Sequence, residues 1–469
     1  MAAVALDRVC ALSPPEVLLH DTRTGEIRRL TPSDPPKVRI YACGPTVYGR
    51  VHVGNARPFV VFSQLKRFLN AVGYEAELVA NVTDINDKIY AAASAAGVPS
   101  GQLAVDMTAA YVDETDRFGL GRPDHEPLAS ETIGPIITLI AQLIEGGHAY
   151  EADGDVYFSV RSYPGYGELS HRDVDQMDQG EDDQAHPPAA RKRDPLDFAL
   201  WKAQKPGEDT SWRSPWGPGR PGWHIECSAM AQELLGTDFE IHGGGSDLIF
   251  PHHENEAAQT TAATGTPLAQ IWMHNGMLRL DAEKMSKSVG NVFGLGEALE
   301  RHGPETLLMY FSQGHWRQPL EYDETRLAQA AAAAARIREA GRRLIQGPSP
   351  DWLSPRRAAF FEALAHDFNV PKALVSVFDW VSDANRADAG TVGSDDLRAM
   401  LDVLGLAGLL DSDSRERPER AKELARRRNV ARAEREYAEA DRLRDELRAQ
   451  GWEVRDGPEG PELFPRDVA

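Results

Sequence analysis

The stretch KVRIYACGPTVYGRVHVGNARPFVVFSQLKRFLNAVGYEAELVANVT, residues 37–83, decides the fold of this chain. Its first part, KVRIYACGPTV, is an apolar run that predicts a buried strand entering a turn with a glycine. NARPFVVFSQLKRFLNAVG then places apolar residues at helical spacing and ends at a glycine, and YEAELVANVT predicts a second strand. These elements form a βαβ unit, and in open α/β sheets ligands bind at the carboxyl ends of the strands. We therefore expect an α/β protein with a Rossmann-like parallel-sheet core and a ligand site in the first turn.

The size and composition of the chain describe a globular protein with more than one domain. Its 469 residues exceed the usual limit for one hydrophobic core, and 42% of them are hydrophobic and 26% charged. No apolar run approaches the roughly 18 residues that a membrane span needs, and the start MAAVALDRVCALSPPEV lacks a basic segment leading into an apolar one. We therefore expect a cytoplasmic protein with no membrane partner. Its three cysteines cannot make a disulfide framework, and such isolated cysteines are usually buried apolar residues; they are Cys10, Cys43 and Cys227.

Changes in composition along the chain predict three domains. Residues 1–296 hold the βαβ unit and the glycine-rich and aromatic segments, so we expect the catalytic, nucleotide-binding domain there. Helical patterns dominate afterwards, and ETRLAQAAAAAARIREAGRRLI predicts one strong helix in a helical bundle domain over 297–411. A C-terminal segment, 412–469, begins with a long charged helix and ends with WEVRDGPEGPELFPR, a predicted small hairpin. The polar, proline-containing stretch 175–194 predicts a surface excursion from the first domain.

Charge is spread unevenly over the chain. The formal net charge of −21 argues against a nucleic-acid partner for the molecule as a whole. Residues 415–450, however, carry 12 Lys and Arg against 9 Asp and Glu, an excess of 3. The C-terminal segment can therefore meet a phosphate backbone, because the acidic majority lies elsewhere.

The motif HVGN, residues 52–55, lies where the first turn enters its helix. The imidazole of His52 and the amide of Asn55 lie beside the N–H groups of a helix start, and Gly54 permits close backbone approach. These features suit a triphosphate. Turns that bind nothing often contain such residues too, so HVGN alone is weak support for a nucleotide site.

A second motif, KMSKS at 284–288, is more specific. Lys284 and Lys287 bracket a methionine and a serine in a loop between predicted elements. A loop that brings two ammonium groups onto a leaving pyrophosphate stabilises charge that develops only in the transition state. A Lys-x-x-Lys pair is common by itself, whereas its combination with HVGN is not.

The stretch PHHENEAAQ, residues 251–259, places two histidines ahead of two glutamates. His252 and Glu256 are four residues apart, and on a helix such positions share one face, so that His253 points elsewhere. A metal site, an acid and base pair and a polar helix start all fit this pattern.

Together HVGN and KMSKS resemble the two signatures of class I aminoacyl-tRNA synthetases, and their surroundings resemble the cysteinyl-tRNA synthetase family. The resemblance covers roughly residues 40–320 and extends less distinctively into the helical remainder and the tail. One position departs from the family, whose first signature usually ends in histidine where this chain has Asn55. An amide can still donate to a phosphate or ribose oxygen, but it carries no charge. The matching blocks are CGPTVY (43–48), NVTDINDK (81–88), DFALWK (197–202), GWHIECSAM (222–230), HGGGSDLIFPHHENE (242–256), EKMSKS (283–288) and GHW (314–316).

The resemblance implies that one Zn²⁺ per chain is held by four side chains from distant parts of the sequence. Two thiolates, an imidazole and a carboxylate are acceptable ligands for this ion. A metal serves discrimination, because cysteine differs from serine by one atom and packing separates such near-isosteres poorly. Zn²⁺ binds a thiolate well, whereas a serine hydroxyl forms no comparable bond. The four implied ligands are Cys43, Cys227, His252 and Glu256.

The resemblance also implies a pocket for the substrate. Asp247 would pair with the substrate ammonium and Trp223 would wall the pocket against larger side chains, with Thr83 and His224 nearby. Taken singly, each of these residues has an ordinary structural alternative, such as a helix cap or a core tryptophan. A glycine run would let the backbone lie against adenine, although it also fits a turn; it consists of Gly243, Gly244 and Gly245.

The implied reaction has two steps. The cysteine carboxylate attacks the α-phosphate of ATP, with Mg²⁺ bridging phosphate oxygens, and the cysteinyl group then passes to the terminal adenosine of tRNA-Cys. Lys284 and Lys287 would stabilise the leaving pyrophosphate while His52 and Asn55 hold phosphates at the helix start. Trp452 in the tail can stack on an unpaired base of the tRNA or belong to a core. The resemblance also implies a monomer.

Two alternatives remain open from the sequence. A cysteine ligase that acts on glucosaminyl-inositol in mycothiol synthesis shares the adenylation core but lacks the tail, so residues 412–469 favour the tRNA enzyme. A zinc-containing RNA-binding protein without catalysis is the other alternative, and the intact KMSKS and HVGN motifs argue against it.

Overall fold

The chain folds into two compact units, one made of Met1–Ile337 and Arg343–Ala407 and the other of Arg338–Arg342 and Gly408–Ala469. Most of the expected surface excursion over 175–194 lies outside the described residues. Among the residues that are described, no helix is both long and apolar enough to cross a membrane. The structure, a computed structural model, describes residues 14–177, 192–280, 283–284, 293–411, 419–433, 436–449, 452–457 and 460–465.

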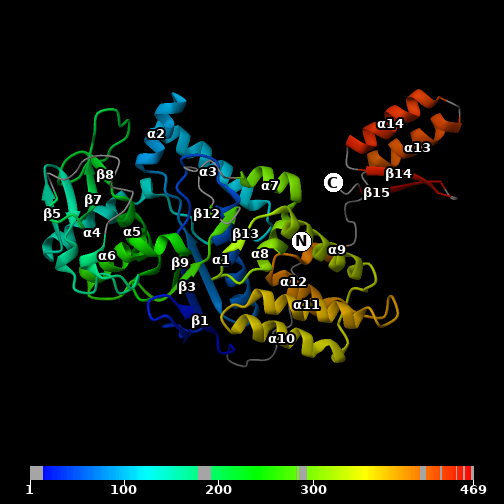
Figure 1. The fold of residues 1–469 in the computed structure, drawn as a ribbon, viewed down its shortest axis with the longest axis horizontal. Coiled ribbons are helices and arrows are strands. Elements are labelled where there is room, and N and C mark those ends of the chain that lie inside the picture. The colour runs from blue at the N-terminus through cyan, green and yellow to red at the C-terminus, as the bar shows by residue number, and fades with distance from the viewer. Residues whose placement is uncertain are drawn as a thin grey trace. The chain divides into compact units, whose positions relative to one another are not determined.

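The centre of the first unit is a sheet of four parallel strands in the order β10-β9-β3-β4 (Figure 1). The predicted βαβ unit is confirmed, because β3 leads through α1 to β4, which pairs with β3 in parallel. Helix α1 contacts both strands, and all of its residues from Phe59 to Leu65 are buried. The chain is therefore an α/β protein with a parallel-sheet core, as expected. These elements are β3 (Lys37–Ala42), α1 (Val53–Ala71), β4 (Glu75–Ala80), β9 (Phe239–Gly245) and β10 (Ala269–Asn275).

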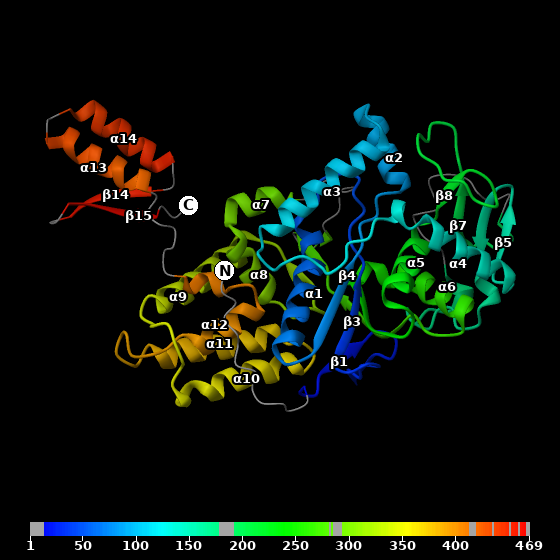
Figure 2. The same ribbon diagram turned by 180° about the vertical axis from the view of Figure 1, so that it is seen from behind.

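The chain between β4 and β9 builds a second layer in the same unit. Its strands with α4 and α5 are seen at one end of the unit in Figures 1 and 2, whereas α3 lies beside α7. Its four strands form an antiparallel sheet in the order β5-β6-β7-β8. Ile140 of α4, Phe158 of β6 and Ile225 of α5 share one buried core. This layer therefore holds α5 firmly beside the central sheet. Its elements are α2 (Asp87–Ala96), α3 (Ser100–Asp116), α4 (Ile133–Glu145), β5 (Ala149–Ala152), β6 (Asp155–Phe158), β7 (Phe198–Ala203), β8 (Gly219–Pro221) and α5 (Trp223–Leu235).

Beyond β10 the chain forms a three-stranded sheet in the order β12-β11-β13, followed by helices. The strong helix predicted from ETRLAQAAAAAARIREAGRRLI is confirmed as α9. A hairpin of β1 and β2 precedes the central sheet, and α6 lies between β9 and β10. The bounds are β1 (Leu18–Asp21), β2 (Glu26–Arg29), α6 (Glu254–Thr264), β11 (Leu278–Leu280), β12 (Glu283–Lys284), α7 (Leu295–His302), α8 (Pro304–Ser312), β13 (Leu320–Glu321), α9 (Glu324–Gly341), α10 (Ser354–Ala365), α11 (Val370–Ala384) and α12 (Asp395–Val403).

The second unit contains two helices and a hairpin, α13 (Glu419–Ala433), α14 (Tyr437–Ala449), β14 (Trp452–Gly457) and β15 (Gly460–Pro465). The expectation of a single long charged helix is wrong, whereas the small hairpin is confirmed. The helices pack on each other because Leu424 and Leu443 share a small core, and Trp452 is buried in it. Trp452 is therefore a core residue, which is one of the two roles expected for it from the sequence.

Candidate functional site

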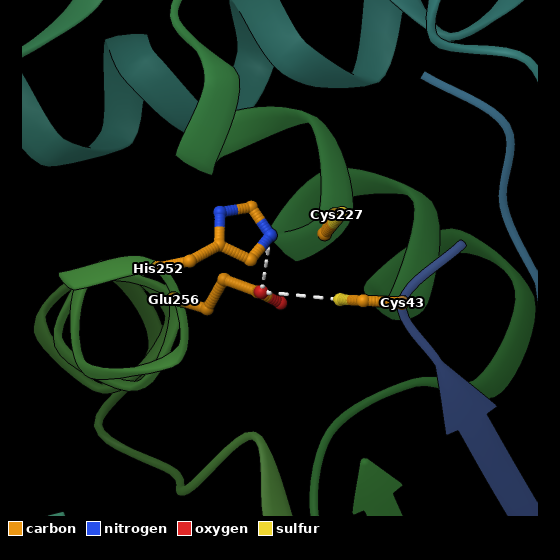
Figure 3. A group of neighbouring side chains, drawn as sticks. All are labelled: Cys43, Cys227, His252 and Glu256. Atoms are coloured by element: carbon orange, nitrogen blue, oxygen red, sulfur yellow. Dashed lines mark hydrogen bonds and ion pairs between the residues drawn. The ribbon is translucent and has the colours of Figure 1, made fainter. Parts of the chain in front are cut away.

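Four buried side chains from distant parts of the chain meet at the carboxyl end of β3 (Figure 3). Cys43 directly follows β3, and its backbone N–H donates to Gly243 O at 2.9 Å, which ties it to the end of β9. Cys227 lies in α5, while His252 lies in the short helical segment η6 (Ile249–His253) and Glu256 in α6. The sheet and the two helices thus bring together the four residues expected to bind zinc.

The geometry of this cluster fits a metal ion. The ligand atoms of the four residues all lie within 4.8 Å of one another. Cys43 Sγ lies 3.5 Å from Glu256 Oε1, and His252 Nε2 lies 3.0 Å from the same oxygen. Two thiols, one imidazole and one carboxylate form a donor set that suits Zn²⁺. The cluster can therefore hold one such ion, although its role as a metal site remains a proposal.

The electrostatics of the cluster favour a cation. Burial raises the pKa of the Cys43 thiol well above its usual range, whereas the hydrogen bond from Cys43 lowers the pKa of Cys227 to about 6. Burial opposes the charged form of His252, but the neighbouring Glu256 carboxylate raises the pKa of this imidazole to about 10. Burial also opposes ionisation of Glu256, yet the charges of the surrounding imidazoles hold its pKa well below the usual range. Cys227 and Glu256 are thus held as anions beside a protonated His252, and a bound metal ion would supply the balancing positive charge in place of that proton.

A second group of possible ligands shares Cys43 and Glu256 with the first and adds His242 and His253. His253 Nε2 lies 3.3 Å from Cys43 Sγ, and His242 Nε2 lies 3.1 Å from Glu256 Oε2. His253 Nδ1 also lies 2.7 Å from His274 Nε2. The expectation that His253 points away from Glu256 is therefore wrong, because its Nε2 lies 3.8 Å from Glu256 Oε1, and His242 carried no expectation from the sequence. The only sign of these two ligands in the sequence is their position: His242 directly precedes the glycine run, and His253 follows the proline of PHHENEAAQ by two residues.

The residues expected around the amino acid lie beside this cluster to different degrees. The Trp223 ring stacks on the His252 ring with centroids 4.2 Å apart, and His224 Nδ1 lies 3.0 Å from His252 Nδ1. Thr83 is buried and accepts a hydrogen bond from Asn81 Nδ2 at 3.3 Å. Asp247 is exposed, so its carboxylate is accessible to a substrate. Direct contact thus places Trp223 and His224 at the cluster, whereas the proximity of Thr83 and Asp247 to it stays a prediction.

The glycine run is the end of strand β9 and not a turn. A Cβ atom at Gly243 would come within 2.1 Å of the Phe62 ring of α1, so glycine is needed for the close packing of helix on strand. A Cβ at Gly245 would come within 2.5 Å of Asp247 Oδ1. Packing therefore explains Gly243, whereas the exposed Asp247 side chain can move away from a Cβ at Gly245, and a role of the run at adenine remains a proposal.

The HVGN motif forms the start of α1. His52 is the residue that precedes the helix, and its backbone N–H donates to Asn55 Oδ1 at 3.1 Å. A Cβ at Gly54 would lie 2.8 Å from the His52 ring, so only glycine lets this imidazole lie over the helix start. The N–H groups and positive dipole end of a helix favour an anion here.

The chain that follows KMSKS lies against this same turn. Val53 N–H donates to Phe293 O at 3.0 Å, and Leu295 N–H donates to Val51 O at 3.0 Å. Residues 293–295, which follow the KMSKS motif, therefore lie beside HVGN, although the two motifs are far apart in sequence. The backbone of Lys284 belongs to β12, whereas Lys287 lies outside the described residues.

Comparison with known sequence families gives two matches. The family described as the tRNA synthetases class I (C) catalytic domain matches residues 29–332, and the DALR domain family matches residues 359–410.

Curated relatives match the chain almost from end to end. A cysteine–tRNA ligase of Pseudothermotoga lettingae is 44% identical and the match covers 94% of this chain and 97% of that protein. A cysteine–tRNA ligase of Halorhodospira halophila is also 44% identical, with 94% of this chain and 98% of that protein covered.

Solved structures share the fold at low sequence identity. Methionyl-tRNA synthetase of Mycobacterium tuberculosis in complex with methionyl-adenylate matches with a TM-score of 0.58 at 15% identity, covering 81% of this chain and 92% of that one. A leucyl enzyme of Agrobacterium radiobacter in a ternary complex with tRNA matches with a TM-score of 0.59 at 11% identity, covering 81% of this chain and 85% of that one.

Proposed function

The chain belongs to the cysteine–tRNA ligase family of class I aminoacyl-tRNA synthetases, and we propose that it joins L-cysteine to the 3′-terminal adenosine of tRNA-Cys, choosing the amino acid through a zinc ion. The observation that carries this proposal is the meeting of Cys43, Cys227, His252 and Glu256 at the carboxyl end of β3, the strand that leads into α1. A cluster that can bind a thiolate, on the strand that leads into an anion-binding helix start, suits an enzyme that activates cysteine with ATP.

The amino acid is selected by chemistry and by shape. The four clustered side chains would hold one Zn²⁺, which when bound supplies a soft Lewis acid for the substrate sulfur. Trp223 stacks on His252 and so limits the space beside the metal ligands to a small side chain. The exposed Asp247 carboxylate pairs with the substrate ammonium. Serine is rejected because its hydroxyl forms no comparable bond to the ion.

ATP lies along the helix start. His52, Asn55 and the first N–H groups of α1 bind phosphate oxygens, with Mg²⁺ as the partner of ATP. Gly243 to Gly245 lie at the carboxyl end of β9, where the adenine would pack against the backbone. Lys284 and Lys287 reach the leaving pyrophosphate as the cysteine carboxylate attacks the α-phosphate. Positioning and charge suffice, so this step requires no protein nucleophile.

In the second step the cysteinyl group passes from the adenylate to the 2′-hydroxyl of the terminal adenosine of the tRNA. The helices α9 to α12 and the second unit supply the surfaces for the body of the tRNA. A cytoplasmic, monomeric enzyme remains our expectation.

The test compares cysteine with serine in ATP–pyrophosphate exchange on zinc-loaded protein, together with metal analysis and transfer of labelled cysteine onto total tRNA. We expect about one zinc per chain, exchange with cysteine but not with serine, and label on tRNA. Label transferred only to glucosaminyl-inositol would overturn the choice of acceptor. Cysteine-stimulated exchange that is equal in zinc-loaded and zinc-free protein would overturn the role of the metal.

A further inference from the structure

The guanidinium of Arg57 is buried in α1, two residues beyond Asn55, and is only 2% exposed. Its five hydrogen-bond partners in the described part of the chain are all backbone carbonyl oxygens. Burial lowers the pKa of Arg57 to about 10, so the side chain stays charged at neutral pH. A buried charge without a carboxylate is costly, and five accepting carbonyls are needed to offset that cost.

The carbonyls belong to two chain segments that meet at this guanidinium. Nη1 donates to Gly276 O at 2.6 Å and to Met277 O at 3.3 Å, just before β11 begins. Nη2 donates to the carbonyls of the loop before β13, at 3.1 Å, 3.4 Å and 2.7 Å for residues 315, 316 and 318. Arg57 therefore binds the segments that directly precede β11 and β13 to α1.

These two segments also pack tightly on each other. Gly276 N–H donates to Trp316 O at 2.8 Å, and a Cβ at Gly276 would lie 2.3 Å from Gln318 O. Strands β11 and β13 then pair in parallel, with Leu278 opposite Leu320. Strand β12, which contains the backbone of Lys284, pairs with the other edge of β11.

Arg57 thus links the two halves of the ATP site. Helix α1 carries His52 and Asn55 at its start, and β11 leads into the segment with Lys284 and Lys287. The far end of that segment is already fixed to the same turn by the bonds of Val51 and Val53 to residues 295 and 293. The start of that segment follows β11, which the hydrogen bonds from Arg57 to Gly276 O and Met277 O hold against α1.

We propose that Arg57 is a positioning residue for adenylation, which sets the distance between the phosphate-binding start of α1 and strands β11 and β12, from which the KMSKS segment continues. This inference rests on the proposed function, because it assigns those lysines to the leaving pyrophosphate. Only arginine supplies a planar fork with five donors, whereas lysine has three donors on a single nitrogen. A displacement of about 1 Å in such a constellation can cost about 100-fold in rate.

The experiment measures cysteine-dependent ATP–pyrophosphate exchange for Arg57→Met and Arg57→Lys, well below the unfolding temperature of each variant. We expect kcat to fall about 100-fold for Arg57→Met and about 10-fold for Arg57→Lys. The KM for cysteine and the bound zinc should stay unchanged, because the metal cluster does not contact this side chain. If Arg57→Met does not fold, Arg57→Lys keeps the charge and decides the matter.

Arg67 offers a matched control on the same helix. Its Nε donates to Asp402 O at 2.7 Å and its Nη1 to Leu120 O at 3.2 Å, so it also binds carbonyls, but away from β11 and β13. Arg67→Met should lower the unfolding temperature and leave the exchange kinetics within about twofold. Folded Arg57 variants with wild-type kcat and KM for ATP would overturn the inference. An inactive wild-type enzyme would instead overturn the proposed function.

Discussion

The two halves of the candidate site are built in different ways. The metal cluster consists of four buried side chains that the sheet and helices α5 and α6 hold within 4.8 Å of one another. The phosphate side consists of main-chain groups at the start of α1, a single side-chain cap from Asn55, and a segment that is fixed at its ends. Substitutions in the metal cluster should therefore abolish zinc binding and, with it, the activation of cysteine. Substitutions on the phosphate side should lower the rate of adenylation and leave the bound zinc unchanged.

The largest effect that would test this contrast is expected from Cys227→Ser. The variant should lose zinc, because a serine hydroxyl is a poor ligand, and cysteine activation should fall more than about 1000-fold in kcat/KM. Metal analysis and pyrophosphate exchange measure the two effects. Cys10→Ser is the matched control and should keep both. Full metal content in Cys227→Ser would remove this thiol from the site.

Lys287→Ala should act on the other half alone. Adenylation should slow by about 100-fold, because one charge on the leaving pyrophosphate is lost. The bound zinc and the affinity for cysteine should remain. Lys372→Ala, at an exposed position of α11, provides the control for loss of a lysine. An unchanged exchange rate for Lys287→Ala would refute its role.

Asp247→Asn should have a smaller effect, confined to the amino acid. The KM for cysteine should rise about 10-fold, because a charged hydrogen bond to the ammonium becomes a neutral one. Steady-state exchange at varied cysteine and varied ATP separates the two substrates. A rise in the KM for ATP with no change in the KM for cysteine would show that this carboxylate acts on ATP and not on the amino acid.

Asn55→His should have the smallest effect. The amide oxygen accepts the His52 N–H at 3.1 Å, and an imidazole nitrogen can take over this role, so activity should stay within about threefold. Asn55→Leu removes the acceptor and should lower both stability and exchange. Complete inactivation of Asn55→His would show that the turn has been rebuilt around the amide.

Much of the fold could be predicted because it is locally encoded. The βαβ unit over 37–83 follows from the spacing of apolar residues, which sets the period of a strand or helix, and α9 follows from the high helix propensity of its alanine-rich sequence. The tail was predicted less well, because its charged sequence gives no sign that α13 ends at Ala433 and α14 begins at Tyr437, the division that lets Leu424 and Leu443 share a core.

The candidate site could be predicted only in part. The residues of HVGN and KMSKS are contiguous motifs, so their chemistry is visible in the sequence. The four metal-binding candidates came from a family resemblance, because spacing alone does not join Cys43 to Cys227. His242 and the inward position of His253 were missed, because helical spacing gives no information on which buried ring meets another.

The sequence by itself determined the local elements, the two nucleotide motifs and the chemical types available for a metal. Tertiary structure alone decided that Cys43 meets Glu256, that Phe293 and Leu295 lie against the turn of HVGN, and that the carbonyls of two distant loops converge on Arg57. The physical reason is that periodicity is fixed by backbone geometry over a few residues, whereas contacts between distant segments depend on how whole layers pack.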